Sequence, residues 1–462
     1  MTRTIKLAMA AAMALTATSA FATNGDNLMG LGAKARGMGG VGIATAFGAE
    51  SGLANPALLS AVKSNEISFG GTLFMPKVDF ESNAFAEAYS AATATPVMPV
   101  ESDTSKADMS MIPEVALASR INENVVVGIG MFGVAGMGTD YRDTLDPASG
   151  VSSNGSFGMR TNLQLMRFAV PVSYSNSGFS VGVAPMLQYG SLNIAYAMPL
   201  ATGGIDPQGS GVSEDFGFGY EVGIAYDAGA VGITGLTLGA KYQSSIDMTY
   251  DHTLEVTSQA FGLQGIDDHL EQPAEIGFGI SYDVLGSGNT IAFDYKQIRW
   301  ADAKGYKEFE WDNQNVFSVG YQYERNNWAV RLGYNYAENP IQEQAGAAAG
   351  FTPAGMPVNY EGAVKNFFNL AGFPAVVESH ITAGGTYSFT DMISVDAAFV
   401  YAPEVSFSYD TTAMGQGLAA NMVLQNGGSP ADAGAAAAAT GDSSADVKHS
   451  QTGVTVQLNY AF

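Results

Sequence analysis

Apolar and polar residues alternate along much of the chain. The clearest example is the C-terminal stretch VTVQLNYAF from Val454 to Phe462, in which the first of every two residues is apolar. Because successive side chains of a β-strand point to opposite faces, this pattern predicts a strand with one strongly apolar face. Equally regular alternation occurs at 236–243, 276–282, 317–323 and 328–336.

The whole pattern predicts an all-β fold, a 14-stranded antiparallel transmembrane β-barrel. An even number of strands lets a bacterial barrel close with both ends on one side. Apolar positions would then face lipid, and the alternate positions would face the lumen. The predicted strands are 66–78, 109–120, 124–138, 161–175, 178–195, 215–227, 235–251, 274–284, 289–300, 314–324, 327–338, 378–389, 392–409 and 449–462.

The connections between the predicted strands alternate in length. After even-numbered strands they are short turns, such as Ser177-Gly178 and Thr390-Asp391. Bacterial barrels carry short turns on the periplasmic side and long loops outside, so we expect that orientation here. The alanine-rich segment 433–446 is expected to be a mobile external loop. The long connections are residues 79–108, 139–160, 196–214, 252–273, 339–377 and 410–448.

The composition fits a membrane barrel better than a soluble periplasmic β-protein. Hydrophobic residues make up 47% of the chain and charged residues 14%, yet no stretch beyond the leader reaches the roughly 18 apolar residues of a transmembrane helix. Gly, Tyr and Phe are abundant, as in transmembrane barrels. The net charge of −24 opposes nucleic-acid binding. The absence of Cys excludes disulfides, thiolate metal sites and a thiol nucleophile.

The beginning of the chain has the form of an export signal. Two basic residues precede a short apolar stretch, and Ala20-Phe21-Ala22 matches the A-x-A pattern of a signal-peptidase site. We therefore predict that residues 1–22 are a signal peptide and that the mature protein begins at Thr23. Because no Cys is present, a lipoprotein anchor is excluded.

Residues 23–65 precede the first predicted strand and do not alternate. They are rich in glycine. A barrel of about fourteen strands has an interior wider than its own side chains can fill. We therefore predict that residues 23–65 form an N-terminal plug inside the lumen and that residues 66–462 form the transmembrane barrel. The alternative, a disordered periplasmic tail, is disfavoured by the apolar stretch Ala54–Leu59.

No pattern in the sequence predicts catalysis. Gly37 to Gly42 fits G-x-G-x-x-G, but the strand and helix that a dinucleotide site requires are not predicted around it. The four histidines are scattered without a metal-ligand spacing, and no serine is placed beside a positioned histidine. An outer-membrane hydrolase is therefore unsupported. We expect no enzymatic activity, no cofactor and no metal.

Charged residues at inward positions of the predicted strands allow two interpretations. In most barrels such charges form a solvated or ion-paired lumen wall. The sharper interpretation is that Arg167 or Arg331 binds a substrate carboxylate inside an otherwise apolar pocket. The inward charged residues are Arg167, Lys241, Asp294, Lys296, Arg331 and Asp396.

Other inward positions are unusually apolar. Leu163, Leu165 and Met186 fall on the inward face, and the predicted strand 124–138 is apolar on both faces. A water-filled porin would carry rings of charge at such positions. We therefore expect Leu163, Leu165 and Met186 to contact a hydrophobic substrate.

Several short motifs occur together in one order. Ala35–Ala44 has the sequence ARGMGGVGIA, Asn55-Pro56-Ala57 follows it, Gly136–Tyr141 has the sequence GMGTDY, and the chain ends in LNYAF. In these motifs the mature chain resembles the FadL-type family of outer-membrane transporters. That family imports long-chain fatty acids and aromatic hydrocarbons.

The resemblance implies a barrel with an N-terminal hatch and an inward kink in the third strand, which opens a lateral exit to the membrane. Glycine permits a bulge in a strand, and proline cannot donate to a ladder. The connection 196–214 is shorter than the helical insertion that fatty-acid importers carry there. The implied gate residues are Asn55, Pro56 and Ala57, and they would face a kink at Gly133, Gly136 and Gly138.

These observations predict passive uptake of hydrophobic compounds, either long-chain fatty acids or hydrocarbons, across the outer membrane of a Gram-negative bacterium. The alternatives are a channel for small polar solutes and a surface adhesin or receptor. Besides its substrate, we expect the protein to contact outer-membrane lipid and lipopolysaccharide. The terminal Phe is the signal that the outer-membrane assembly machinery recognises. We expect a monomer that binds no nucleic acid.

Overall fold

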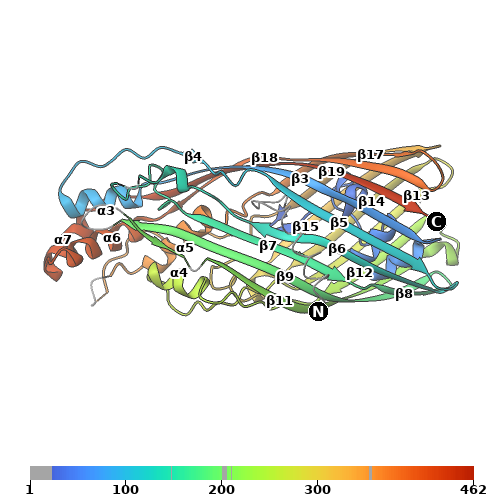
Figure 1. Cartoon of the computed structure of the whole chain (residues 1–462), viewed down its shortest axis with the longest axis horizontal. Helices are drawn as coiled ribbons and strands as arrows, with labels where there is room; N and C mark the ends of the chain where they lie inside the picture. The colour runs from blue at the N-terminus through green and yellow to red at the C-terminus, as the bar shows by residue number, and fades with distance from the viewer. Residues whose placement is uncertain (1–22, 147, 200–204, 210, 353–355) are drawn as a thin grey trace.

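The computed structural model describes residues 23–146, 148–199, 205–209, 211–352 and 356–462. The predicted signal peptide, residues 1–22, lies outside this part. The described chain forms a long antiparallel barrel (Figure 1). Its fourteen staves are β3 (Glu66–Ser82), β5 (Ser110–Arg120), β6 (Val125–Met137), β7 and β8 together (Arg160–Ala169 and Val172–Asn176), β9 (Phe179–Pro199), β11 (Val212–Asp227), β12 (Leu236–Gln243), β13 (Glu275–Val284), β14 (Asn289–Ile298), β15 (Gln314–Arg325), β16 (Trp328–Ala337), β17 (Ser379–Ser388), β18 (Ile393–Asp410) and β19 (Ser444–Ala461).

The barrel closes through its first and last strands. β19 pairs with β3 along the full length of β3, from Ala445 opposite Ser82 to Ala461 opposite Glu66. This pairing leaves no free edge at the junction, as a sheet in lipid requires. The predicted fold class is confirmed, and most strand boundaries agree with the prediction within a few residues.

One predicted strand is too long. We expected a strand to residue 251, but β12 ends at Gln243. The sequence keeps alternating beyond Gln243 because every second residue, Ile246, Met248 and Tyr250, is apolar and buried. These residues leave the ladder and pack inside the barrel against glycines of β9 and β11, where isolated bridges replace a regular ladder. Period-2 alternation therefore continues past the point where the chain leaves the wall.

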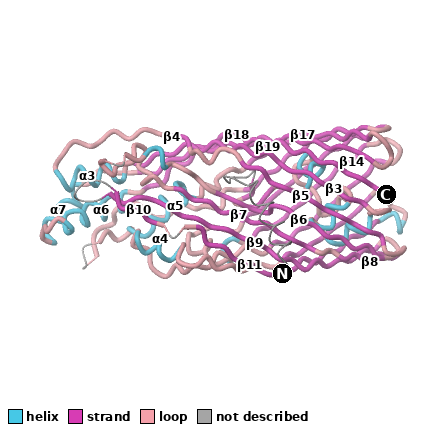
Figure 2. Tube along the Cα trace, viewed as in Figure 1, coloured by secondary structure: helices cyan, strands magenta, loops and turns pink. Residues whose placement is uncertain are grey.

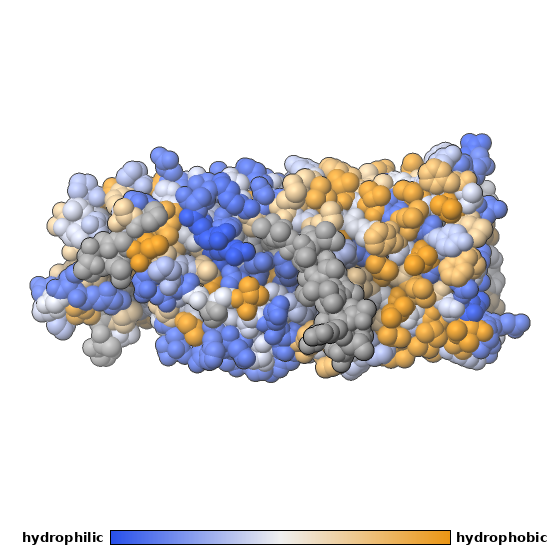
Figure 3. All heavy atoms as spheres, in the orientation of Figure 1, coloured by the Kyte–Doolittle hydropathy of each residue, from blue (hydrophilic) through white to orange (hydrophobic). Residues whose placement is uncertain are grey.

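The outward side chains of one half of the barrel are apolar. Figure 3 shows hydrophobic residues gathered on the half with the short turns, whereas hydrophilic residues dominate the other half. On β16 and β19, Leu332 and Val456 are 60% and 54% exposed. Exposed apolar side chains on consecutive strands form the lipid-facing band of a transmembrane barrel.

Four of the long connections form helices at the opposite end of the molecule from the C-terminus (Figures 1 and 2). We expected the segment 433–446 to be a mobile loop, but its first residues belong to a helix that ends at Ala439. This helix starts at a capping box made by Ser429 and Asp432. None of the described helices is long and apolar enough to cross a membrane. The helices are α3 (Ala84–Thr93), α4 (Leu254–Ala260), α5 (Tyr360–Gly372), α6 (Thr412–Gln425) and α7 (Pro430–Ala439).

Most of the described segment before β3 is buried against the inner side of the barrel wall (Figure 1). Two glycines allow a close approach, because a Cβ at Gly333 of β16 would lie 2.1 Å from the Gly39 nitrogen. Gly39 has a φ of +72°, a backbone conformation that favours glycine, and its N–H donates to Thr382 Oγ1 at 2.9 Å. The segment contains β1 (Thr23–Asn24), β2 (Asn27–Leu28), α2 (Gly32–Gly37), η1 (Ala49–Leu53) and η2 (Pro56–Ala61).

Candidate functional site

The ladder between β5 and β6 is interrupted halfway along. Pairing runs from Arg120 opposite Val126 to Glu114 opposite Phe132 and stops there. Residues 110–113 of β5 continue to pair with β3 on the other side but have no β6 partner among the described pairings. The register of β6 against β7 also shifts between Gly133 and Ala135. The wall therefore has a break at this point.

Beyond the break, β6 turns toward the N-terminal segment. Ala135 pairs with Asn27 of β2, and the Gly136 N–H donates to the Asp26 carbonyl oxygen at 3.2 Å. Residues 132–137 are all buried. The freed backbone groups of the strand are thus partly satisfied from inside the barrel, which apolar surroundings demand.

The three glycines implied by the resemblance lie in or beside this part of β6. A Cβ at Gly133 would lie 2.6 Å from Ile112 Cγ2, and one at Gly138 would lie 2.3 Å from the Thr161 carbonyl oxygen. Both approaches are too close for a larger residue without movement of the neighbour. The inward course of β6 therefore depends on glycine at 133 and 138.

The Asn55-Pro56-Ala57 motif lies against a different part of the wall. Asn55 caps η2 by accepting the Ala57 N–H at 3.1 Å, and its side-chain amide donates to the Ile43 carbonyl oxygen at 2.7 Å. A Cβ at Gly223 of β11 would lie 1.8 Å from the Asn55 side-chain oxygen. The motif therefore packs on β9 and β11, and the contacts that we expected it to make with 133–138 come instead from Asp26 and Asn27.

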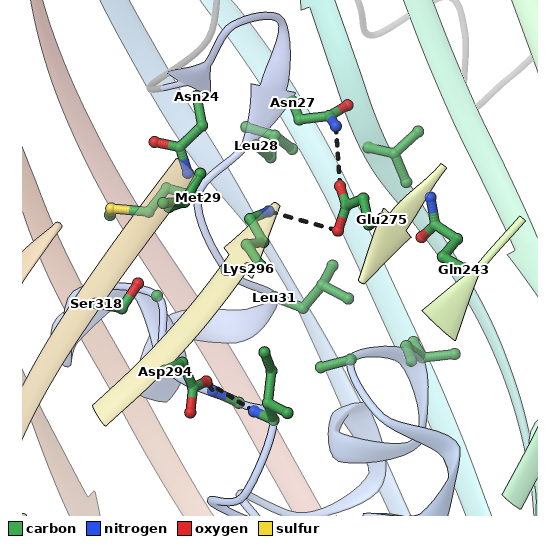
Figure 4. A pocket seen from close by; sticks show the side chains of 18 of the residues that line it. Asn24, Asn27, Leu28, Met29, Leu31, Gln243, Glu275, Asp294, Lys296 and Ser318 are labelled. Carbon is green, nitrogen blue, oxygen red and sulfur yellow. Dashed lines mark hydrogen bonds and ion pairs between the residues drawn. The ribbon is translucent and has the colours of Figure 1, made fainter. Parts of the chain in front are cut away.

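A charged chamber lies between the N-terminal segment and the break. Its volume is about 100 Å³, and Phe132, Gly133 and Val134 form one side. Figure 4 shows Glu275 accepting from the Asn27 side chain at 2.9 Å and facing Lys296, whose ammonium lies 3.6 Å away. The charged lining residues are Arg167, Lys241, Glu275, Asp294 and Lys296.

The two arginines singled out from the sequence lie in different places. Arg167 lines the chamber and donates to the side-chain oxygens of Gln188 and Gln243, at 2.8 and 2.7 Å. No described carboxylate lies within ion-pair distance of it. Arg331 is also buried but is absent from the chamber wall, and it donates to Gln322 and Thr386.

A second, apolar cavity of about 30 Å³ lies toward the helical end. Leu163 lines it, whereas Leu165 and Met186 are buried in the same apolar core without reaching the cavity. The remaining lining residues are Met137, Leu254, Leu270, Gly305, Tyr306, Phe309, Trp311, Asn369 and Phe373.

Sequence reasoning missed the aromatic residues of this region because they lie in connections. Trp300, Tyr306 and Trp311 form a triangle with ring centroids 4.6 to 5.2 Å apart. The available signal was composition, because Trp300, Tyr306, Phe309 and Trp311 crowd into one connection. Exposed loops rarely carry so many large apolar residues, so this crowding indicates that the connection is buried in the protein.

The fold and these cavities define an outer-membrane transport barrel. An apolar belt surrounds a lumen that the N-terminal segment occupies, and the wall of that lumen is broken beside a cavity. Residues 8–349 match the family described as outer membrane protein transport protein (OMPP1/FadL/TodX). The chain belongs to this family of outer-membrane proteins.

Known proteins with similar sequences carry transport or outer-membrane names. The long-chain fatty acid transport protein of Escherichia coli is 24% identical over 459 residues, which cover 87% of this chain and 92% of that protein. Outer membrane protein P1 of Haemophilus influenzae is 22% identical over 411 residues, which cover 78% and 83%. Both alignments cover most of each chain.

Solved structures share the fold. A Pseudomonas aeruginosa FadL homologue superposes with a TM-score of 0.64 at 15% identity, covering 95% of this chain and all of the other. The Pseudomonas putida toluene transporter TodX gives 0.62 at 18% identity, with 95% and 100% covered.

Proposed function

We propose that the protein mediates the passive uptake of hydrophobic compounds and releases them sideways through the break between β5 and β6. The observation that carries this proposal is the break itself, which adjoins the chamber and is held by the N-terminal segment. The names of the relatives, a long-chain fatty acid transport protein and a toluene transporter, support a hydrophobic cargo.

The route follows one face of β7. Leu163, Leu165 and Arg167 are alternate residues, so their side chains point into the lumen in a row. Leu163 lines the outer apolar cavity and Arg167 lines the chamber. A substrate captured at the helical end would pass from the first cavity to the second and reach Gly133 at the break.

Lateral release is favoured by the cost of the alternative. A hydrophobic molecule that entered the periplasm directly would be exposed to water at about 0.8 kcal/mol per CH₂. A molecule that leaves into the bilayer avoids this cost. The opening must be covered from inside when no substrate is present, because lipid does not satisfy free backbone groups.

The N-terminal segment supplies this cover. We propose that residues 23–65 act as a plug for the barrel of residues 66–462, and that Asn55, Pro56 and Ala57 anchor the plug while the β1–β2 hairpin covers the break. Thr23 is buried, and its N–H donates to Gln451 at 3.2 Å. A chain cleaved after Ala22 would keep this contact through its new amino group.

The remaining expectations follow from the same function. Passive transport requires no covalent chemistry, no cofactor and no metal. Contacts with lipid and lipopolysaccharide would be made by the apolar belt and the outer loops, and the terminal Phe462 would serve the assembly machinery. Nothing in the transport route requires a second copy, so the protein would act as a monomer.

The test fills the break with a charged side chain. Gly136→Arg should abolish uptake of both labelled oleate and labelled toluene by intact cells, while heat-modifiable mobility on gels stays normal. Gly434→Arg is the matched control, because Gly434 lies in α7 with open space around it. Undiminished uptake by a folded Gly136→Arg variant would contradict lateral release.

A channel for small polar solutes is the second candidate. A polar vestibule of about 660 Å³ lies at the end with the short turns, lined by Glu123, Asp227 and Asp283 among others, and the chamber is charged. Together they would suit a hydrated path down the lumen. Uptake of polar solutes that survives in Gly136→Arg, together with steady conductance in planar bilayers, would favour this candidate.

A further inference from the structure

The β1–β2 hairpin is held from the outer loops as well as from the wall. Gly25 lies against the Trp300 ring, which a Cβ at this position would approach to 2.5 Å. The Tyr306 hydroxyl donates to the Asp26 carboxylate. Gln272 donates to Asp26 at 3.3 Å and to the Asn27 side chain at 2.5 Å. Gln272 lies in the connection before β13, and Trp300 and Tyr306 lie in the connection after β14.

The same two hairpin residues contact the broken strand. The Asp26 carbonyl oxygen accepts the Gly136 N–H, and Asn27 pairs with Ala135. The Asp26 side chain and the Asp26 carbonyl thus face different partners, an outer loop and β6. A movement of the hairpin would change the contacts of both.

Tyr306 has a second contact that makes it a connecting residue. It lines the outer apolar cavity together with Met137 at the end of β6 and Leu163 of β7. It is 4% exposed, and it packs in the aromatic triangle with Trp300 and Trp311. One side chain therefore forms part of the cavity wall and also donates a hydrogen bond to the hairpin.

The cavity cannot accept a substrate without movement. Its volume is about 30 Å³, roughly the share of one water molecule in the liquid, whereas a cavity that binds benzene measures about 150 Å³. A hydrocarbon that enters must displace lining side chains. Of those that line the cavity, Tyr306 is the one whose described hydrogen bond reaches the hairpin.

We propose that Tyr306 is a positioning residue that couples occupancy of the outer apolar cavity to the break in the wall, through its hydrogen bond to Asp26. A hydrophobic substrate that displaces the Tyr306 side chain breaks this bond, and the hairpin then releases Ala135 and Gly136. The coupling rests on the proposed function for its purpose, but its mechanical part can be tested without measuring transport.

The chain offers a clean probe for hairpin release because it contains no Cys. Asn24 is 1% exposed, and its side-chain amide has no hydrogen-bond partner among the described residues. Asn24→Cys therefore places one buried thiol on the hairpin at little structural cost. Its maleimide labelling rate in the purified full-length mature protein reports the fraction of time for which the hairpin is released.

The decisive variant is Tyr306→Phe, which keeps the ring and removes the hydroxyl. Loss of a hydrogen bond to a carboxylate corresponds to about a tenfold or larger change in an equilibrium, so labelling of Asn24→Cys should accelerate about tenfold. Tyr360→Phe is the matched control, because its hydroxyl donates to the Phe261 carbonyl at 3.0 Å and does not contact the hairpin. It should label like the parent.

Two further experiments test whether Asp26 is the partner of Tyr306 and whether substrate acts through Tyr306. Asp26→Ala should accelerate labelling, and adding Tyr306→Phe to it should change the rate little further, because both remove the same bond. Saturating toluene should accelerate labelling in the parent but not in Tyr306→Phe. Parent-like labelling of Tyr306→Phe, or an equal response of both proteins to toluene, would overturn the proposal. If the labelling rates follow these expectations but the protein fails to take up substrate, the result would contradict the proposed function alone.

Discussion

The Arg167 guanidinium is buried inside the barrel with amide oxygens as its described hydrogen-bond acceptors. Glu275 and Glu221 act on this cation only from beyond ion-pair distance, so it remains able to bind an anion that enters its site. The adjoining chamber gives such an anion a place to sit. A substrate with a carboxylate head and an apolar tail would match the row from Arg167 to Leu163.

We therefore expect Arg167→Gln to weaken binding of decanoate by about tenfold or more and binding of decane very little, because a charged hydrogen bond contributes about 1.5–3 kcal/mol. Bound ligand would be extracted from the purified protein and quantified by mass spectrometry. Arg331→Gln serves as the control, since Arg331 is absent from the chamber wall. Equal losses for the acid and the alkane would make Arg167 a purely structural charge.

Asp26 makes hairpin docking sensitive to pH. Burial raises the pKa of its carboxyl to about 6, although hydrogen bonds from Tyr306 and Gln272 oppose the shift and Glu275 adds to it; Tyr250 also faces this carboxylate. A carboxyl whose pKa is higher when docked contributes stability below its free pKa and loses it as the pH rises through about 6. Docking is therefore tighter in acid.

This direction can be measured with the thiol at position 24. Labelling of Asn24→Cys, divided by that of an exposed Ser177→Cys to remove the ionisation of the thiol itself, should rise several-fold from pH 5 to pH 7.5. In an Asp26→Asn background the ratio should stay flat. A slope that persists with asparagine at 26 would assign the effect to another group.

At the scale of elements, the strands could be predicted from alternation, whereas the helices of the loops could not. A barrel wall imposes one strict periodicity, apolar to lipid and mixed inside. The helices α3, α6 and α7 pack on one another through small residues such as Ala88, Ala419 and Ala436. Alanine on all faces gives no apolar stripe, so the sequence of α7 resembled a low-complexity loop.

The η2 element depends on one side chain. Asn55 caps it and also donates to the Ile43 carbonyl oxygen inside the plug. Asn55→Leu removes the cap, worth about 1 kcal/mol, and leaves a buried carbonyl oxygen without its donor, which costs about 1–3 kcal/mol. We expect residues 55–62 to exchange amide hydrogens at least tenfold faster, while the barrel strands stay protected.

The matched control for this variant is Asn426→Leu, because Asn426 is exposed at the end of α6, far from the plug in sequence. Exchange in residues 55–62 should be unchanged by that substitution. If Asn55→Leu left exchange there unaltered as well, packing against β9 and β11 rather than the cap would hold η2.

At the scale of the whole molecule, the two cavities show what sequence reasoning can find. The inward positions of Arg167 and Leu163 followed from alternation, and each lines a cavity. The contact between Asp26 and Tyr306 joins residues 280 positions apart. It depends on how the closed barrel brings a loop over the plug, and no local periodicity encodes that arrangement.

The orientation of the barrel in the membrane is a prediction for the entire chain. The five loop helices lie at one end and the short turns at the other (Figure 1), and the polar vestibule opens among the short turns. If the helical end captures substrate from outside, an epitope inserted at Gly427, between α6 and α7, should bind antibody on intact cells. Gly427 has open space around it, so we expect it to tolerate an insertion. An insertion beside Gly203 would be the equivalent test in a connection outside the described residues.

An epitope inserted at Ser177, in the turn between β8 and β9, should bind antibody only after the outer membrane is permeabilised. Both insertions lie at connections, so the barrel ladder stays intact and heat-modifiable mobility should be normal for both proteins. The orientation follows from the rule that bacterial outer-membrane barrels carry short turns on the periplasmic side and longer loops outside. Antibody binding at Ser177 on intact cells, with none at Gly427, would reverse the orientation. The outer apolar cavity would then face the periplasm, and uptake through the β5–β6 break would have to start from the opposite end.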